Sequence, residues 1–301
     1  MLQHVLEATL RQTMQRLVRP LLTPAVPVRV QRILTRQAYR SSIPPRGCHF
    51  EQNSIAGVPV TRTRYGSAQT APSGQVILYL HGGGYIIGSA TTHRGITGHL
   101  ARASGALVVT PDYRLAPEHV FPAALDDALA VYRGLIGEGF PPAAIAVAGD
   151  SAGGGLTLAL AMRLRDENLP LPGSLVVFSP WTDLSHSQLY RPDCEPVLQA
   201  EWIEKAARLY CGNEARSNPL ISPVFGDLSG LPPLLIQVGS QEILLNDATR
   251  LAETAKQQNV DTTLEIYNSL WHVFQVHAGQ LSRATRAIET AGKHIRRHMP
   301  L

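Results

Sequence analysis

Cysteine is scarce in this chain of 301 residues, where it occurs only as Cys48, Cys194 and Cys211. An odd number of cysteines without close pairing does not fit a disulfide framework, and none of them stands at the spacing of metal ligands. No other cluster has the ligand spacing of a zinc or calcium site. We therefore expect free thiols in a reducing cytoplasm and no bound metal.

Long hydrophobic runs are missing as well. No stretch of about eighteen uncharged apolar residues occurs, so neither a membrane-spanning helix nor stable insertion into a membrane is expected. Glu7, Arg11 and Arg16 interrupt the first apolar segment, and no small-residue cleavage site follows, which argues against an export signal. Without repeats or low-complexity tracts, a chain with 44% hydrophobic and 17% charged residues is typical of one elaborated globular domain.

Acidic residues are nearly absent from the N-terminal segment. Residues 1–46 hold eight arginines and one glutamate, whereas the remainder holds 19 basic and 22 acidic residues. A basic segment can bind nucleic acid or anionic lipid. Tyr39 is the only aromatic residue among those arginines, too few for a base-stacking surface. We therefore expect no nucleic-acid partner and interpret the segment as an amphipathic helix with a solvated basic face.

The N-terminal residues have the apolar periodicity of helices. Apolar side chains recur at helical spacing over residues 2–18 and predict one amphipathic helix, and a second helix is expected over 28–40. Both come before the first convincing strand, at 58–65. We therefore expect residues 1–45 to form a helical cap segment rather than a layer of the sheet.

From Val76 onward, short apolar runs rich in β-branched residues alternate with helical patterns. Most of these runs are about five residues long and apolar throughout, which is typical of parallel strands buried on both faces. The expected strands are 75–80, 106–110, 144–149, 174–179, 233–239 and 262–268. The helices between them are expected at 93–103, 122–136, 153–167 and 246–258. This order predicts an α/β fold with a mostly parallel, doubly wound sheet.

One long interval interrupts the alternation, between the strand that ends at Ser179 and the next, near Pro233. A helix is expected at 196–210 within this interval. Ligands in open α/β sheets bind at the carboxyl ends of the strands, so an insertion there is expected to cover the substrate. We assign 181–231 to a cap insertion within a single domain of residues 1–301.

A candidate nucleophile lies in the sequence Gly-Asp-Ser-Ala-Gly at 149–153, which fits G-x-S-x-G between an expected strand and an expected helix. In that context Ser151 would lie on a sharp, strained turn, with the N-terminus of the next helix favouring negative charge at its Oγ. The pattern alone is weak, because a glycine-rich turn can simply pack a helix onto a strand. Its position directly between strand and helix favours a nucleophilic serine.

Three glycines follow His81 at the end of the first parallel strand. A tetrahedral intermediate needs backbone N–H donors aimed at its oxyanion, and glycines let the backbone approach without intervening side chains. Together with the N–H of Ala152, the residue after the serine, this loop is expected to form an oxyanion hole. A phosphate-binding loop is the alternative, but no Lys-Ser/Thr follows and the spacing is not G-x-G-x-x-G.

A general base is expected late in the chain, after the acid. Among eleven histidines, His272 follows the last expected strand in a loop before the final helix, where it could reach the edge of the sheet. We expect His277, His294 and His298 to lie within that helix, too far along the chain to reach the serine.

Two carboxylates compete for the orienting acid, and either could hold the imidazole tautomer and stabilise the imidazolium. Glu242 follows the strand expected at 233–239, in the loop where such a group belongs. Asp247 opens the next helix, where a carboxylate also favours the helix dipole. Position therefore favours Glu242.

From about Val76 to its end, the chain resembles the bacterial hormone-sensitive lipase family of α/β-hydrolase esterases. The motifs that carry the resemblance are HGGGY (81–85), DYRLAPEH (112–119), FPAALDDA (121–128), GDSAGG (149–154), SPWTDL (179–184) and WHVF (271–274). The resemblance implies an α/β-hydrolase fold whose N-terminal helices and mid-chain insertion cap the site, and it implies no cofactor.

Carried over position by position, the resemblance implies Ser151 as nucleophile and His272 as base. The residues it assigns to the oxyanion hole are Gly83, Gly84 and Ala152 as donors, with His81 and Gly82 shaping the loop. The family usually has D-P-L-x-D where this chain reads Glu-Ile-Leu-Leu-Asn at 242–246, so the leading acid falls on Glu242.

These features predict a serine carboxylesterase that hydrolyses short- to medium-chain esters of small molecules through an acyl-enzyme. A lactone hydrolase, an amidase or a peptidase would use the same triad, because the pocket selects the leaving group. The alternative outside enzymes is a hormone-binding module on the same fold. The gibberellin receptors are an example, since they resemble this family but lack the catalytic histidine. The presence of His272 argues against it. The sequence leaves a homodimer open.

Overall fold

The computed structural model describes residues 2–39, 42–66, 74–190 and 195–299. Eight strands within these residues form one sheet, in the order β1-β2-β4-β3-β5-β6-β7-β8. The strands are β1 (Cys48–Ile55), β2 (Val58–Tyr65), β3 (Val76–Leu80), β4 (Leu107–Pro111), β5 (Ile145–Asp150), β6 (Ser174–Phe178), β7 (Leu234–Gly239) and β8 (Thr262–Tyr267). Strands β3 to β8 are parallel, and the antiparallel pair β1–β2 extends the β4 edge. The predicted α/β fold is confirmed.

Strand β1 was not among the expected strands. Most of its side chains are exposed or only half-buried, because it lies at the edge of the sheet. Its sequence, CHFEQNSI, therefore lacks the continuous apolar run by which buried strands are recognised. It pairs along its whole length with β2, the strand expected at 58–65.

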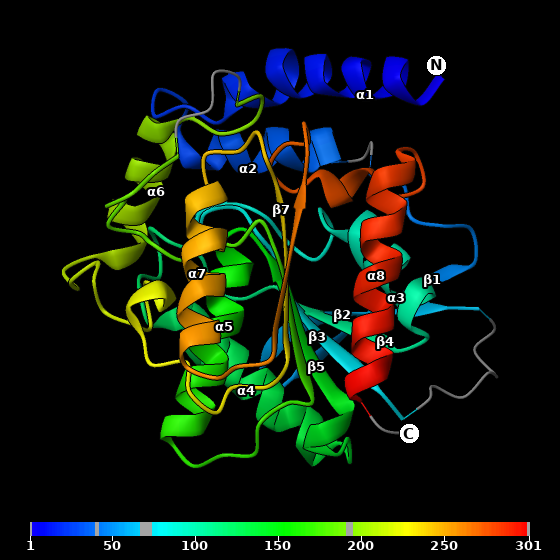
Figure 1. Cartoon of the computed structure of the whole chain (residues 1–301), viewed down its shortest axis with the longest axis vertical. Coiled ribbons are helices and arrows are strands. Elements are labelled where there is room, and N and C mark those ends of the chain that lie inside the picture. The colour runs from blue at the N-terminus through cyan, green and yellow to red at the C-terminus, as the bar shows by residue number, and fades with distance from the viewer. Residues whose placement is uncertain (1, 40–41, 67–73, 191–194, 300–301) are drawn as a thin grey trace.

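Helices cover both faces of the sheet (Figure 1). They are α1 (Leu2–Thr13), α2 (Val28–Ala38), α3 (Arg94–Ser104), α4 (Ala123–Gly137), α5 (Ala152–Asp166), α6 (Ala200–Cys211), α7 (Leu245–Gln257) and α8 (Ser282–His298). The parallel strands alternate their side chains between two cores. One core joins Leu78 and Leu80 to α4, α5 and α7, and the other joins Ile77 and Tyr79 to α3 and α8.

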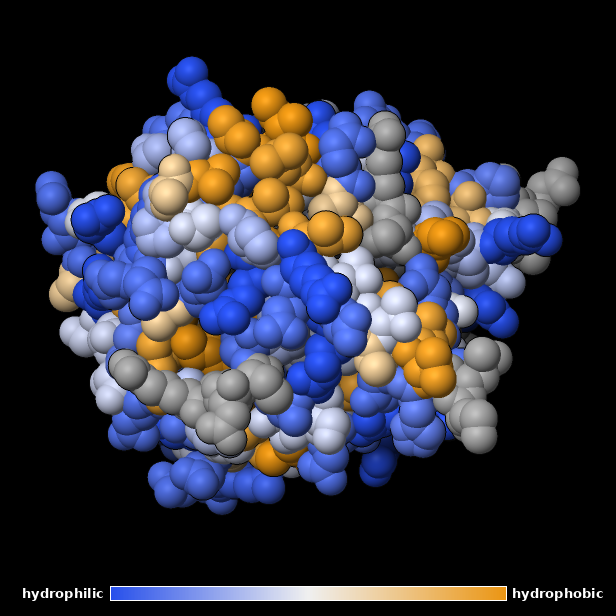
Figure 2. Space-filling model, turned by 90° about the horizontal axis from the view of Figure 1, so that it is seen from above, coloured by the Kyte–Doolittle hydropathy of each residue, from blue (hydrophilic) through white to orange (hydrophobic). Residues whose placement is uncertain are grey.

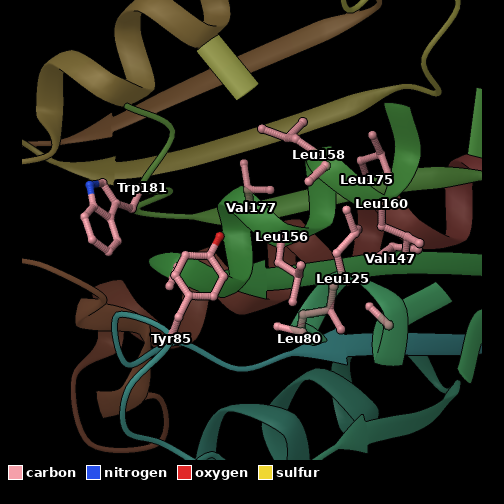
Figure 3. Close-up of a cluster of buried hydrophobic side chains, with 14 of the residues drawn as sticks. Leu80, Tyr85, Leu125, Val147, Leu156, Leu158, Leu160, Leu175, Val177 and Trp181 are labelled. Carbon is pink, nitrogen blue, oxygen red and sulfur yellow. The ribbon is translucent and has the colours of Figure 1, made fainter. Parts of the chain in front are cut away.

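The larger core includes Ala152, the residue after the candidate nucleophile. Side chains from β3, β5 and β6 meet Leu156 and Leu160 of α5 and Leu125 of α4 in this cluster (Figure 3). Tyr85 and Trp181, fully or almost fully buried, lie at one end of it. Because this packing fixes α5 on the sheet, it also fixes the turn that enters α5.

The N-terminal helix differs from the expected single helix over 2–18. Helix α1 ends at Thr13, and Met14–Val18 form a wider π turn that turns Val18 inward. Such an extra residue in the ladder changes the helical phase, which the spacing of apolar residues does not reveal. The chain then continues through a 3₁₀ turn into α2, and α1, α2 and α6 lie together at one end of the molecule (Figure 1).

Two other expected boundaries differ. The helix expected at 196–210 begins at Ala200, so residues 196–199 form a loop. The final helix begins at Ser282, and His277 lies before it in a 3₁₀ turn, Phe274–His277. The prediction that His277 belongs to the final helix is therefore wrong.

Candidate active site

Ser151 lies on the turn between β5 and α5, with φ 52° and ψ −120°. This is a strained conformation for a residue with a side chain, and such strain is typical of a nucleophile held at a strand-to-helix turn. The turn can close only around small residues. A Cβ at Gly149 or Gly153 would collide with facing backbone atoms, among them the carbonyl oxygen of Leu80.

The glycine loop after β3 lies beside this turn. Gly83 and Gly84 have positive φ angles of 117° and 60°, which favour glycine. The N–H of Gly82 donates to Asp150 Oδ1 at 3.1 Å, so it is already occupied and shapes the loop. No such bond is found within the described residues for the N–H groups of Gly83 and Gly84. Ala152 opens α5, where a backbone N–H has no acceptor within its own helix.

His272 and Glu242 form a buried pair in which His272 Nδ1 lies 2.7 Å from Glu242 Oε2. The second carboxylate oxygen, Oε1, accepts the Ser179 hydroxyl at 2.8 Å and the Gly239 N–H at 2.5 Å. Burial opposes a charged imidazole, but the hydrogen bond and the charge of Glu242 outweigh burial and raise the pKa of His272. The carboxylate can therefore fix the ring and stabilise its protonated form.

Ser179 is a site residue that the sequence reasoning did not single out. It directly follows β6 and has a positive φ of 46°, and its hydroxyl both donates to Glu242 and accepts the N–H of Val273 at 3.0 Å. One hydroxyl thus holds the acid and the backbone beside the histidine. Its only local signal is its place at the start of the SPWTDL motif.

Asp247 does not contact the histidine. It is almost fully buried, and its Oδ2 accepts the N–H groups of Thr182 and Asp183 at 2.8 Å each. Burial raises its pKa to about 7, against the effect of those two donors. The expectation that Asp247 acts through a helix dipole is therefore incomplete, because it anchors the loop that follows β6.

A second buried pair includes Asp150, the residue before Ser151. His93 Nε2 is 3.3 Å from Asp150 Oδ1, which also accepts the Tyr79 hydroxyl at 2.7 Å. Burial disfavours the charge of each partner, but their mutual attraction raises the pKa of His93 and lowers that of Asp150. Since Asp150 also holds Gly82, this pair braces the glycine loop.

Ser151 and His272 line the same cavity of about 60 Å³. Gly83 and Gly84 also line it, and most of its other lining side chains are apolar. These include Met14, Val18, Leu22, Val197, Leu198 and Trp202. His277 also lines the cavity, and burial lowers its pKa to about 4. His277 thus lines the same cavity as Ser151, although it forms no hydrogen bond or ion pair with Glu242 or Asp247 among the described residues.

Neither a metal cluster nor a membrane span is found in the part of the chain that the structure describes. These residues contain no group of three or more His, Cys, Asp or Glu side chains that could hold a metal ion. None of the helices they form is long and apolar enough to cross a bilayer. Cys48 and Cys211 are free thiols, and Cys194 lies outside the described residues.

Comparison with known proteins gives consistent matches. A model of the alpha/beta hydrolase fold family matches residues 77–276. An acetyl-hydrolase of Streptomyces hygroscopicus is 43% identical over 226 residues, which are 74% of this chain and 76% of that protein. An esterase of Acinetobacter venetianus is 37% identical over 222 residues, 72% of this chain and 73% of its own length.

Solved structures match almost the whole chain. An esterase from the bacterial hormone-sensitive lipase family is 37% identical, with a TM-score of 0.89 over 99% of this chain and 98% of its own. The esterase EstE5, in a crystal soaked with p-nitrophenyl butyrate, is also 37% identical, with a TM-score of 0.89 over 98% of both chains.

Proposed function

Because this chain belongs to the alpha/beta hydrolase fold family, and within it to the esterases of the bacterial hormone-sensitive lipase family, we propose that it acts through Ser151, Glu242 and His272. The chain is a serine carboxylesterase, as its relatives are esterases and acetyl-hydrolases. The observation that carries the residue assignment is the 2.7 Å contact between Glu242 and His272, whose ring lines the same cavity as Ser151.

In the first half of the reaction, His272 Nε2 takes the proton of Ser151 as Oγ attacks the ester carbonyl. Glu242 occupies Nδ1, which leaves Nε2 for the serine, and its charge stabilises the imidazolium. The protonated histidine then gives its proton to the departing alkoxide, which leaves as the alcohol. The acyl group remains on Oγ.

In the second half, His272 removes a proton from water, and the resulting nucleophile attacks the acyl-enzyme. The serine oxygen leaves with the proton from Nε2, and the carboxylic acid is released. In both halves the oxyanion would be held by the N–H groups of Gly83, Gly84 and Ala152, with Gly82 as the residue that shapes the loop.

Short- to medium-chain acyl groups are the proposed substrates. The cavity of about 60 Å³ is small, and Trp202 and Leu198 of the cap lie in its wall. Initial rates on p-nitrophenyl esters from acetate to palmitate test the proposal. We expect kcat/KM to be highest among the shorter chains and to fall steeply toward palmitate. A preference for palmitate, or cleavage of the matching anilides in place of the esters, would contradict it.

We also propose that residues 1–45 and 181–231 cap one domain that spans residues 1–301. Gln199, in the loop before α6, supports this because its side-chain N–H groups donate to the carbonyl oxygens of Arg19 and Leu22 at 2.9 and 3.0 Å. Deleting residues 1–40 should therefore impair activity or folding more than any affinity for DNA or anionic vesicles. Salt-sensitive binding lost on deletion, with esterase activity intact, would show instead that the segment is a binding arm.

A homodimer in the cytoplasm is the proposed state of the protein. Apolar side chains gather on the outer face of the cap, which Figure 2 views from above. The large exposed ones on α1, α2 and the π turn are Val5, Leu17, Val30, Ile33 and Leu34. Light scattering should give a dimer for the full chain and a smaller mass for a Leu17→Ser, Ile33→Ser variant. A monomer at every concentration would rule out the dimer.

A further inference from the structure

A third buried carboxylate lies beside the triad, and the reaction described above gives it no role. Glu195 is 8% exposed and stands in the loop that leads into α6. Its Oε1 accepts the N–H groups of Val197 and Leu198 at 2.7 and 3.2 Å. Its Oε2 accepts the N–H of Ile243 at 2.8 Å. Both carboxylate oxygens are thus bound by backbone donors.

These three donors belong to two parts of the site. Val197 and Leu198 line the substrate cavity, whereas Ile243 directly follows the proposed acid, Glu242. The carbonyl oxygen of Ile243 in turn accepts the N–H of Tyr190 at 3.2 Å. The backbone of Ile243 is therefore held on both sides by the insertion, and one carboxylate joins the cavity wall to the acid loop.

The chemistry of these contacts requires a carboxylate. A glutamine at this position would have one acceptor oxygen, and its NH₂ group would face a backbone donor. Ionised, Glu195 also places a second negative charge near the histidine. Burial raises the pKa of Glu195 to about 7, protonated His272 lowers it, and Glu242 raises it. The charge of Glu195 also helps to raise the pKa of His272 against the effect of burial, although it contributes less than Glu242 does.

We propose that Glu195 is a positioning residue for ester hydrolysis, which holds the Val197–Leu198 wall against the acid loop and favours the imidazolium form of His272. The inference rests on the proposed function, because it takes His272 as the base. Glu195 acts through groups that it orients and does not touch the reacting atoms. Removing its charge should therefore change the titration of the base as well as the shape of the cavity.

Glu195→Gln is the direct test, with p-nitrophenyl butyrate as substrate. We expect kcat to fall about tenfold and KM to rise, because both the acid loop and the cavity wall lose a hydrogen bond. The rising limb of kcat/KM against pH should move to lower pH, since a lost negative neighbour makes the imidazolium less stable. Glu195→Asp, which keeps the charge, should leave that limb in place and raise KM alone.

Glu201→Gln is the matched control, because Glu201 is exposed on α6 of the same insertion. It should behave as the parent in kcat, KM and pH profile. The proposal is overturned if Glu195→Gln keeps the parental pH profile, whatever its kcat, because a purely structural residue would not move the limb. If the glutamine variant does not fold, a parental KM in Glu195→Asp overturns it.

Ser151→Ala, assayed beside these variants, separates this inference from the proposed function. If Ser151→Ala is active, the proposed triad itself is wrong. If Ser151→Ala is inactive but Glu195→Gln keeps the parental kinetics and pH profile, only the proposed role of Glu195 is wrong.

Discussion

Two buried carboxylate–histidine pairs lie near Ser151. Glu242 and His272 form one, and Asp150 and His93 form the other. In each pair the carboxylate raises the pKa of the imidazole against the effect of burial. Their exposed fractions are also similar, 7% for His272 and 3% for His93. Neither burial nor electrostatics distinguishes the proposed base from its neighbour.

The two histidines differ in whether the ring nitrogen that does not face the carboxylate is occupied by another partner. His93 Nδ1 lies 2.8 Å from the Thr92 hydroxyl and 3.1 Å from the carbonyl oxygen of Ser89, while its Nε2 faces Asp150. His272 uses Nδ1 for Glu242, and among the described residues no hydrogen bond occupies its Nε2. A histidine can act as a base here only if one nitrogen is fixed and the other faces the cavity.

The largest expected effect follows from neutralising the carboxylate of the first pair. Glu242→Gln should keep the fold and lower kcat by about 10²- to 10⁴-fold, because the imidazole loses its orienting charge. Rates with p-nitrophenyl butyrate and a circular dichroism spectrum check both parts. A nearly normal kcat would mean that the acid is another residue.

The equivalent change in the second pair should act mainly on stability. Asp150→Asn keeps an oxygen that can accept the Gly82 N–H, so we expect kcat to fall by about tenfold or less. The lost charge should cost about 1–3 kcal/mol of unfolding free energy, measured by urea denaturation. A loss of kcat as large as that of Glu242→Gln would show that the two pairs do not differ in role.

That cost should depend on pH. The pKa of Asp150 is lowered by folding, so its contribution is lost as pH falls through the lowered value. The pKa of His93 is raised, so its contribution is lost as pH rises through the raised value. The stability difference between parent and Asp150→Asn should therefore peak between about pH 4 and 6.5, the ordinary pKa values of the two groups. A difference that is constant from pH 4 to 9 would contradict the charged pair.

The pH profile of activity reports on the first pair. Because Glu242 raises the pKa of His272, kcat/KM should rise with pH through a value above the ordinary histidine pKa of about 6.5. In Glu242→Gln, the limb over which the residual kcat/KM rises with pH should lie at lower pH than in the parent. If this limb lies at the same pH in the parent and in Glu242→Gln, Glu242 does not act on the catalytic base.

The smallest effect on catalysis is expected at Asp247. Asp247→Asn should keep kcat within a few-fold but lower the unfolding free energy by about 1–3 kcal/mol, because two buried N–H groups lose a carboxylate acceptor. This exceeds what a helix dipole alone would give. A collapse of kcat with normal stability would move the acid from Glu242 to Asp247.

The parallel strands and the triad candidates could be predicted from the sequence because their signals are local. Each of the six parallel strands was expected within one or two residues of its observed bounds, and Ser151 lies in a motif whose strand and helix are adjacent. The edge strand β1 was missed because exposure removes the apolar run. The π turn after Thr13 was missed because one extra residue per turn leaves no mark in composition.

The supporting residues could not be predicted, because their partners are distant in sequence. Ser179 meets Glu242 across 63 residues, and Glu195 meets Ile243 across 48. Nothing in the local pattern around either residue indicates which loop will face it. The expected final helix wrongly included His277, because the 3₁₀ turn Phe274–His277 ends only a few residues before that helix begins at Ser282.

Covalent labelling tests the central claim most directly. The intact protein would be treated with a sulfonyl fluoride or a fluorophosphonate at neutral pH, followed by mass measurement and peptide mapping. We predict one adduct per chain, on Ser151, with loss of esterase activity in proportion to labelling. Labelling of a different serine, or full labelling of Ser151 with activity retained, would contradict the account.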